Sequence, residues 1–428
     1  MPMKTNHSPA VLLLTLSIIG LSACSGEGLT YTPHSEGAPT MEWHVGQGTP
    51  QEEHVHEGIE TTDGGFIAIG QAGEASGQGT DMLIIKVDSE GALEWQQQLG
   101  TEGKSDLGVA VIELSNGDFL AGGGLFNDGE QQRALVRLDA SGEVEWSKTY
   151  THTGVGAVRG LTLADNGSII ATGYVDAGEE GFLFIATEGE GFLMQVDAQG
   201  VLEWDESLSA PQGTKVHSLA TGGYRVLSSG WTDVDGEDKM TSMVLDTDAS
   251  GRENNFQAYE SEGMNQAFDF DQTDDGGAIL AGHTTGYGAA NWDCLLQRID
   301  AEGELVWAKT FGQPRGYSAS YVHDECYGVR VLDDGGFVMT GGSGDEYLYS
   351  AEGHPSGPSD EWKVYLIRTD SDGELEWQNV YGDGADSGNN AGEFMTLTSD
   401  GGFMVFTDTD SAGEAAPNNF GFMKFAVE

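Results

Sequence analysis

Basic residues are scarce in this sequence. Lys and Arg total 18 of 428 residues against 70 Asp and Glu, which gives a formal net charge of −52. A protein this acidic repels phosphate backbones and anionic lipid headgroups unless a cation intervenes, so we expect no nucleic-acid partner. The acidity itself fits either a hydrated surface that keeps the protein soluble in a salty medium or a capacity to bind divalent cations such as Ca²⁺.

Proline and catalytic signatures are also scarce. The chain has 10 prolines. It contains no nucleophile elbow, phosphate-binding loop or zinc-hydrolase motif. Carboxylates are numerous, but no two of them can be assigned as a catalytic acid and base from their spacing in the sequence. Glycine is abundant instead, with 65 residues where an average share of about 7% would give roughly half as many. Many glycines with few prolines favour strands joined by tight turns over disorder or collagen.

The N-terminus predicts a secretory signal at residues 1–23. Lys4 precedes an apolar run at 10–19 that is too short to span a bilayer. The run leads into the tetrapeptide LSAC ending at Cys24, which resembles the lipobox of bacterial lipoproteins, in which this Cys carries the lipid; an ordinary secretion signal is the alternative. Ser25 stands where a lipoprotein kept at the inner membrane typically has Asp, so the resemblance implies the outer membrane, on its periplasmic or surface side.

The rest of the chain divides into a short linker and one domain. Residues 24–40 are mostly Gly, Ser, Thr, Pro and Glu, with too few apolar side chains to bury a core, and predict a flexible tether. Residues 41–428 contain internal repeats, which merge into one continuous core, so we expect a single domain despite its length.

Two turn motifs recur through this domain. The first is a Gly-containing turn before an apolar run, with seven copies that start at Asp63, Asn116, Asn166, Thr221, Asp275, Asp334 and Asp400. Asp or Asn before Gly predicts a hairpin with a two-residue turn, because these residues tolerate the positive φ it requires. The second has Asp three residues before Gly, with six copies at Asp88, Asp139, Asp197, Asp248, Asp300 and Asp370. Here the Asp side chain can accept backbone N–H groups while Gly takes the left-handed conformation.

An aromatic residue follows the second turn in each repeat. It is Trp four positions after the Gly in five copies, and Phe256 stands one position later in the fourth. A Trp repeated at one position predicts packing between units rather than a ligand site.

The seventh unit ends without this strand, and residues 41–48, which include Trp43, match the missing piece. We expect residues 42–48 to pair with 420–427 and close the ring. The predicted fold is all-β: a single seven-bladed β-propeller of four-stranded antiparallel blades.

The repeat resembles that of bacterial extracytoplasmic β-propellers, whose units run DGG, strand, D-x-x-G, strand with Trp. It is also distantly similar to the tryptophan-docking repeat of quinoprotein dehydrogenases, which bind pyrroloquinoline quinone in an eight-bladed ring. This chain has seven units, a turn one residue shorter and no adjacent Cys pair. These departures argue against the quinone.

The strand order of such blades puts both turn motifs on one face and the variable loops on the other, where binding groups usually sit. The longest loops are expected at 284–291, 313–325 and 343–360. They carry or adjoin the candidate ligand-binding residues Trp292, Tyr317, Tyr321, Tyr347, Tyr349 and Trp362. Aromatic groups mixed with carboxylates can hold a glycan or a peptide, and the alternative is that they pack the loops against each other.

We therefore expect a monomeric, membrane-anchored binding or scaffold protein for a protein or carbohydrate ligand. The alternative is an extracytoplasmic enzyme, a hydrolase, a lyase or a quinoprotein-like oxidoreductase, because propellers host enzymes as well. A deep central pocket lined by His, Arg and carboxylates would favour the enzyme, and a shallow aromatic surface would favour the binder.

Two groups of residues have spacings that suit metal ligands. Asp233, Asp235 and Asp238 alternate as in a Ca²⁺ loop but lack the downstream Glu and the flanking helices of an EF-hand, so a solvated acidic turn is the alternative. His54 and His56 lie on one face of a predicted strand, but no third ligand can be identified, which favours coincidence.

With Cys24 lipidated, Cys294 and Cys326 remain in an oxidising compartment. They are expected in blades five and six, both toward the variable-loop face. A disulfide between the blades and two buried free thiols are the alternatives.

Overall fold

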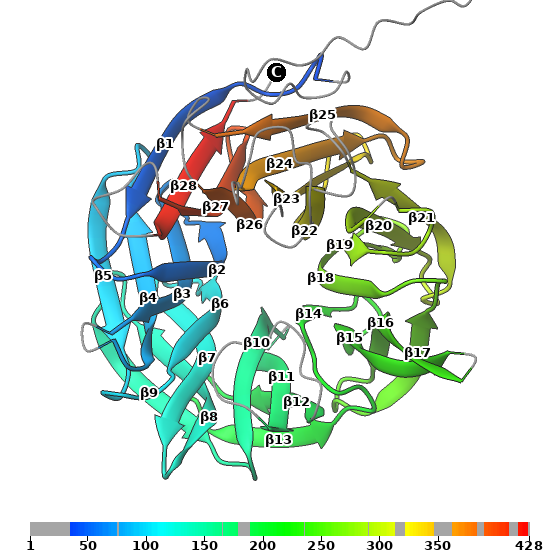
Figure 1. Ribbon diagram of the computed structural model, residues 1–428. Coiled ribbons are helices and arrows are strands. Elements are labelled where there is room, and N and C mark those ends of the chain that lie inside the picture. The colour runs from blue at the N-terminus through cyan, green and yellow to red at the C-terminus, as the bar shows by residue number, and fades with distance from the viewer. Residues whose placement is uncertain are drawn as a thin grey trace, which may run out of the picture.

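The computed structural model describes residues 35–74, 77–164, 166–178, 189–234, 236–289, 291–312, 322–345, 362–382, 389–410 and 418–426. These residues form seven four-stranded antiparallel sheets, each a blade, arranged around one axis (Figure 1). The predicted seven-bladed β-propeller is therefore confirmed. Within the described residues, no helix is long and apolar enough to cross a membrane.

The first strand of each blade lies nearest the axis and the fourth lies at the rim (Figure 1). Blades 1 to 3 are formed by β2 (Glu53–Glu60), β3 (Phe66–Gly73), β4 (Thr80–Val87) and β5 (Leu93–Leu99); β6 (Leu107–Glu113), β7 (Phe119–Asn127), β8 (Glu130–Leu138) and β9 (Val144–Tyr150); and β10 (Val155–Leu163), β11 (Ile169–Ala177), β12 (Glu190–Val196) and β13 (Leu202–Ser207). Blades 4 and 5 are formed by β14 (Lys215–Ser218), β15 (Tyr224–Val234), β16 (Glu237–Thr247) and β17 (Glu253–Tyr259); and β18 (Asn265–Gln272), β19 (Ala278–Thr284), β20 (Asp293–Ile299) and β21 (Leu305–Phe311). Blades 6 and 7 are formed by β22 (Val322–Val331), β23 (Phe337–Asp345), β24 (Trp362–Thr369) and β25 (Leu375–Tyr381); and β26 (Asn390–Leu397), β27 (Phe403–Thr409), β28 (Asn419–Phe425) and β1 (Met41–Gln47).

The N-terminal strand closes the ring as predicted. β1 pairs antiparallel with β28, with a register that runs from Met41 opposite Phe425 to Gln47 opposite Phe420. Figure 1 shows the two strands, blue and red, side by side at the rim. The ladder supplies the seventh blade with its fourth strand, so no blade has an unfilled outer position.

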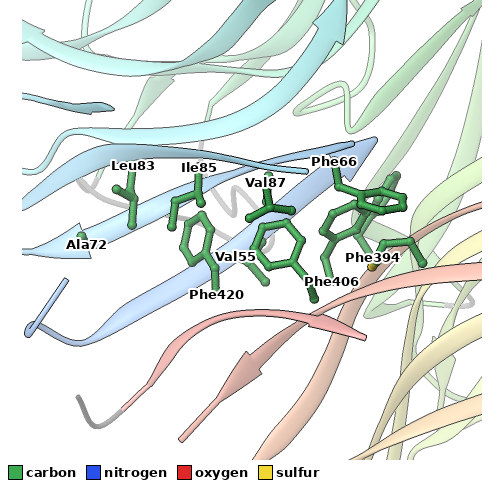
Figure 2. Packing of buried hydrophobic residues seen from close by; sticks show 12 residues of the cluster. Val55, Phe66, Ala72, Leu83, Ile85, Val87, Phe394, Phe406 and Phe420 are labelled. Atoms are coloured by element: carbon green, nitrogen blue, oxygen red, sulfur yellow. The ribbon is translucent and has the colours of Figure 1, made fainter. Parts of the chain in front are cut away.

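The core consists of apolar layers between neighbouring blades. At the junction of blades 7 and 1, Figure 2 shows aromatic side chains of β27 and β28 against aliphatic side chains of β4. Phe406 and Phe420 are fully buried there, as are Leu83, Ile85 and Val87. Continuous apolar runs in the second and third strands are therefore explained by burial of both faces of each blade.

The repeated Trp packs between blades, as predicted. Trp95 of blade 1 lies against the second turn of blade 2, where a Cβ added at Gly142 would come within 2.5 Å of the indole. The ring centroids of Trp95 and Phe119 are 5.8 Å apart. Phe256, one position later in the fourth copy, is 43% exposed and does not occupy the Trp position. Asn255, four residues after the turn glycine, takes the Trp position and donates from Nδ2 to the Glu302 carbonyl at 2.7 Å.

The seventh second-turn glycine comes from the N-terminal segment. Trp377 of blade 6 is buried and lies against Gly37, which has φ of +85°. The Ala426 N–H donates to the Thr40 carbonyl, which extends the β1–β28 ladder by one bond. Residues 35–40, placed in the predicted tether, thus lie against the propeller.

The first turns differ from the predicted two-residue form. In blade 1, five residues separate β2 from β3, and the Gly64 N–H donates to the Thr61 carbonyl at 2.8 Å. Only Gly64 has positive φ, at +83°. Asp63 instead accepts the Gly65 N–H at 3.0 Å and the Thr61 hydroxyl at 2.6 Å, so its role is to hold the turn through its side chain.

A cation from the third strand secures most of these turns. Lys86, which is 1% exposed, contacts Asp63 of the first turn and Glu94 of the fourth strand in the same blade. Equivalent ion pairs join Arg137 to Asp118, Arg298 to Asp275, Arg368 to Asp334 and Lys424 to Asp400. Blade 4 reverses the polarity, with Arg225 on the second strand and Asp246 on the third. We refer to these ion pairs as the turn clamps.

Candidate functional site at the mouth of the central channel

All seven blades contribute to the lining of a small cavity of about 50 Å³ on the propeller axis, and one equivalent position in each blade supplies a residue. We call this set the axial ring: His56, Val109, Arg159, Thr214, Phe268, Tyr327 and Glu393. Each member lies seven residues before the start of its first turn. Six of them fall at a register shift between the first and second strands, and Thr214 immediately precedes β14. A β-bulge re-aims a side chain, which explains why this position faces the axis.

The axial ring opens toward the variable-loop face into a larger cavity of about 210 Å³, the mouth cavity. Tyr327 and Glu393 line both cavities. The other residues of the mouth cavity are Glu325, Gly342, Trp362, Asn389, Ala391, Asp408 and Asn418. All belong to blades 6 and 7 or to the connection before β26, so the mouth cavity is built by two neighbouring blades.

Acidic groups and one imidazole meet at this mouth. Asp408 accepts the Val55 N–H at 2.8 Å through Oδ1 and contacts His54 Nδ1 through Oδ2. Burial opposes protonation of His54, but Asp408, Glu393 and Glu52 favour the imidazolium and raise its pKa to about 9. The strands β2 and β27, far apart in sequence, are brought together by ring closure.

Glu393 lies at the same point on β26. Burial raises the pKa of its carboxyl to about 8, Asp408 and Glu325 add to the rise, and His54 opposes it. Tyr327 donates its hydroxyl to Glu325 Oε2 at 2.6 Å. Two carboxyl groups, those of Glu393 and Asp408, therefore lie close to the imidazole of His54, and Glu325 lines the same cavity.

Basic groups lie deeper along the axis. Arg159 donates from Nη1 to Gln212 Oε1 at 2.8 Å, and burial lowers the pKa of its guanidinium to about 10. Lys215 of blade 4 forms an ion pair with Glu57 of blade 1, across the axis, and its Nζ lies 4.3 Å from the Phe394 ring centroid. The channel is thus acidic at its mouth and crossed by an ion pair below it.

His56 belongs to this deeper level. Its Nδ1 contacts the Gly108 carbonyl at 2.5 Å. Burial and the positive charges of His54, Arg159 and Lys215 hold its pKa well below the usual value, and the Gly108 contact only partly offsets them. The imidazole is therefore neutral and its Nδ1–H donates to the carbonyl.

Trp362 is the predicted aromatic residue that the structure places at the mouth cavity. Its indole lies along β23, where a Cβ on Gly342 or Gly344 would come within 2.6 or 2.3 Å of the ring. The backbone N–H of Trp362 donates to Asn389 Oδ1 at 3.0 Å. The two glycines let the ring lie flat beside the cavity.

Trp292 packs behind the mouth. Its ring meets His283 edge-on with 5.1 Å between centroids, and the ring centroids of His283 and Tyr327 are 5.6 Å apart.

The other predicted aromatic residues, Tyr317, Tyr321, Tyr347 and Tyr349, lie outside the described residues, as does Cys24. Strands β22 and β23 extend further than expected, so Glu325 and Ser343 are strand residues rather than loop residues.

Cys294 and Cys326 form a disulfide with 5.1 Å between their Cα atoms. It joins β20 of blade 5 to β22 of blade 6, and both residues are fully buried. Because β22 also carries Glu325 and Tyr327, the bond fixes one wall of the site to the neighbouring blade.

The predicted acidic loop is a hairpin tip. Asp233 and Asp238 are cross-strand partners at the ends of β15 and β16, and the pair Val234 and Glu237 leaves two residues for the turn. Asp235 lies outside the described residues. A ladder that continues this close to the tip has a different backbone from a 12-residue Ca²⁺ loop.

No protein-family model and no curated protein matches the chain. Among solved structures, it is similar to the WD40 β-propeller domain of Doa1, with a TM-score of 0.54 and 12% identity over 91% of this chain and 98% of that chain. It is also similar to the WD40 domain of Neurospora crassa Pan2, with a TM-score of 0.51 and 10% identity over 91% and 95%. The chain is a β-propeller. At these identities the likeness concerns the fold alone.

Proposed function

We propose that the protein is a cell-envelope binding protein, anchored through a lipid on Cys24, that takes a carbohydrate at the mouth cavity. The observation that carries this proposal is the composition of that cavity. It combines the indole of Trp362 with the amides of Asn389 and Asn418 and the carboxylates of Glu325 and Asp408.

A sugar ring presents an apolar face and a rim of hydroxyl groups. An indole offers a flat apolar surface for the face, while carboxylates and amides accept and donate hydrogen bonds at the rim. The mouth cavity, at about 210 Å³, is below the usual size for an enclosed ligand. It therefore suits one sugar unit of a longer glycan whose remainder extends over the variable-loop face.

Anchoring through Cys24 rests on the LSAC sequence that follows the apolar run at 10–19. The disulfide between Cys294 and Cys326 supports an oxidising compartment. Cys24→Ser should release the protein from the membrane fraction into the soluble fraction. A Cys24→Ser protein that still sediments with membranes would contradict the anchor.

The binding experiment compares two tryptophans, Trp362 at the mouth cavity and Trp231 outside it. The purified protein is screened on a glycan array, and the affinity for the best glycan is measured by calorimetry. Trp362→Ala should weaken binding at least about tenfold, whereas Trp231→Ala, at an exposed site on blade 4, should leave it unchanged. An array without hits, together with Trp362-dependent capture of a purified envelope protein, would assign the mouth to a protein ligand instead.

A second candidate function is hydrolysis of the bound glycan. It is favoured by the convergence of His54, Arg159 and Glu393 on one axis, and by the pKa of Glu393 near 8, which suits a general acid. Binding remains the first candidate because the cavity at the level of Arg159, about 50 Å³, holds only a few water molecules. Product analysis after long incubation of the glycan with the protein decides between them: turnover that is lost in Glu393→Gln would establish the enzyme.

A further inference from the structure

Three possible metal ligands meet where blade 7 joins blade 1. A ring nitrogen of His54 and carboxylate oxygens of Glu393 and Asp408 lie within 4.8 Å of one another. They come from β2, β26 and β27, so the ring must be closed before the set exists. Their spacing allows one ion to contact all three side chains with only small rotations.

One buried oxygen atom at this point lacks a partner among the described residues. Glu393 is half-buried and its carboxyl lies close to the imidazole of His54. Asn418 Oδ1, which is buried and belongs to the mouth cavity, has no hydrogen-bond donor in the described part of the chain. Buried oxygens usually have partners, so Asn418 Oδ1 indicates that the mouth cavity takes up a further group that can donate a hydrogen bond, such as a metal-bound water.

Carboxyl groups outnumber basic groups around this site. Glu325, Glu393 and Asp408 all border the mouth cavity, and His54 is the basic side chain that contacts Asp408 there. Deeper along the axis, Lys215 is engaged with Glu57, Arg330 with Asp269 and Arg159 with Gln212. A metal ion replaces the proton on His54, and an ion of charge +2 between Glu393 and Asp408 would neutralise both carboxylates.

We propose that His54, Glu393 and Asp408 bind one divalent transition-metal ion. A donor set of one imidazole nitrogen and two carboxylate oxygens suits Zn²⁺ or Mn²⁺ better than Ca²⁺ or Mg²⁺, which take oxygen ligands almost alone. Because Glu393 and Asp408 line the mouth cavity, the remaining coordination positions are open to water or to a ligand on that side. His54 is thus a ligand together with residues more than 300 positions away, and not one half of a His54–His56 pair.

The test measures metal binding directly and needs no glycan. The purified protein, without a histidine tag, is treated with a chelator, dialysed, and titrated by calorimetry with ZnCl₂, MnCl₂ and CaCl₂. We expect one equivalent of Zn²⁺ or Mn²⁺ to bind with a dissociation constant at least tenfold lower than that of Ca²⁺. Glu393→Gln and His54→Gln should each weaken binding at least tenfold, and circular dichroism should show both variants folded.

The matched control is Asp238→Asn, which removes one carboxylate from the exposed β15–β16 hairpin. It should bind the metal as the wild type does. Mn²⁺ electron-spin-echo spectra should contain a coupling from one imidazole nitrogen that disappears in His54→Gln. Absence of saturable binding, preference for Ca²⁺, unchanged affinity in Glu393→Gln, or loss of binding in Asp238→Asn would each overturn the proposal.

Discussion

The outer part of each blade and the axial ring follow opposite rules. At the rim, the same residues recur from blade to blade: a turn Asp, a cation that clamps it, and a Trp against the next blade's glycine. At the axis, one structural position carries seven different side chains, from Val109 to Arg159 and Glu393. The repeated positions therefore specify the scaffold, and the position that does not repeat gives the channel its chemistry.

Blade 4 shows that geometry can be kept when the repeated residues change. Arg225 and Asp246 exchange the polarity of the turn clamp, and Asn255 replaces Trp with a hydrogen bond to the next blade. Arg225 also donates to the Ala301 carbonyl of blade 5 at 3.0 Å. The rim thus requires one ion pair within the blade and one contact with the neighbouring blade. Different pairs of residues can supply each of these interactions.

The largest effect is expected from opening the ring. Deletion of residues 41–47 removes β1 and leaves β28 unpaired, so the melting temperature should fall by about 10 °C or more. Adding the same residues after Glu428, joined by a copy of the Asp88–Gly91 turn, should restore most of the loss. Calorimetry checks both, and a deletion variant that melts like the wild type would contradict closure by β1.

A smaller loss is expected at the repeated Trp. Trp95→Ala leaves a cavity against Gly142 and Phe119 and should lower the free energy of unfolding by about 2–4 kcal/mol. Trp231→Ala, at a 46% exposed site outside the repeat, should change it by less than about 0.5 kcal/mol. Equal losses in urea unfolding would show that the Trp position has no special role.

Glu53, at the connection from blade 7 to blade 1, should make stability depend on pH. Burial raises the pKa of its carboxyl from 4.5 to about 7, against hydrogen bonds from Thr49, Phe420 and Asn419 that lower it. The folded state therefore favours the protonated carboxyl. The contribution of this group to the stability of the folded state is fully present below pH 4.5 and is lost as the pH rises through about 7.

The side chain of the Glu53→Gln variant cannot ionise. The free energy of unfolding of the variant minus that of the wild type should therefore be larger at pH 8.5 than at pH 4, by about 1–2 kcal/mol. Urea unfolding at a series of pH values measures this gap. A gap that stays constant across the series would mean that folding does not shift the pKa of this carboxyl.

The smallest effect is expected at a single turn clamp. Lys86→Met keeps the buried stem but removes the charge, and Asp63 and Glu94 can then turn to solvent because their side chains are 59% and 43% exposed. The free energy of unfolding should fall by about 1 kcal/mol or less. A loss as large as that of Trp95→Ala would mean that the clamps, and not the interblade packing, hold the scaffold.

The repeated parts of the molecule could be predicted from the sequence because each repeat confirms the others. The turn glycines, the Trp strands and the closing role of residues 41–48 were all inferred from spacing. The form of the first turn was misjudged, because the Asp–Gly pair alone does not reveal that Asp63 bonds Thr61 and Gly65 through its side chain. Phe256 was placed by similarity of residue type, while the register selects Asn255.

The site was harder to predict. The axial ring has a signal in the sequence, its constant distance of seven residues before each first turn, but only the bulges show that this position faces the axis. His54 had no visible partners because Glu393 and Asp408 lie more than 300 residues away and approach it only through closure. Trp362 was singled out as a candidate binding residue because it follows a long variable stretch of the sequence, and its contact with the mouth cavity follows from the fold.

The direction in which β1 runs determines how the propeller would be oriented and loaded on its anchor. β1 begins at Met41 on the face of the turns and ends at Gln47 on the face of the mouth. If Cys24 carries a lipid, as proposed, the chain would enter the propeller at Ser35 on the turn face, and the mouth would point away from the bilayer. Tension between a ligand held at the mouth and the anchor would then act along β1, where the hydrogen bonds to β28 share the load in shear instead of opening one at a time.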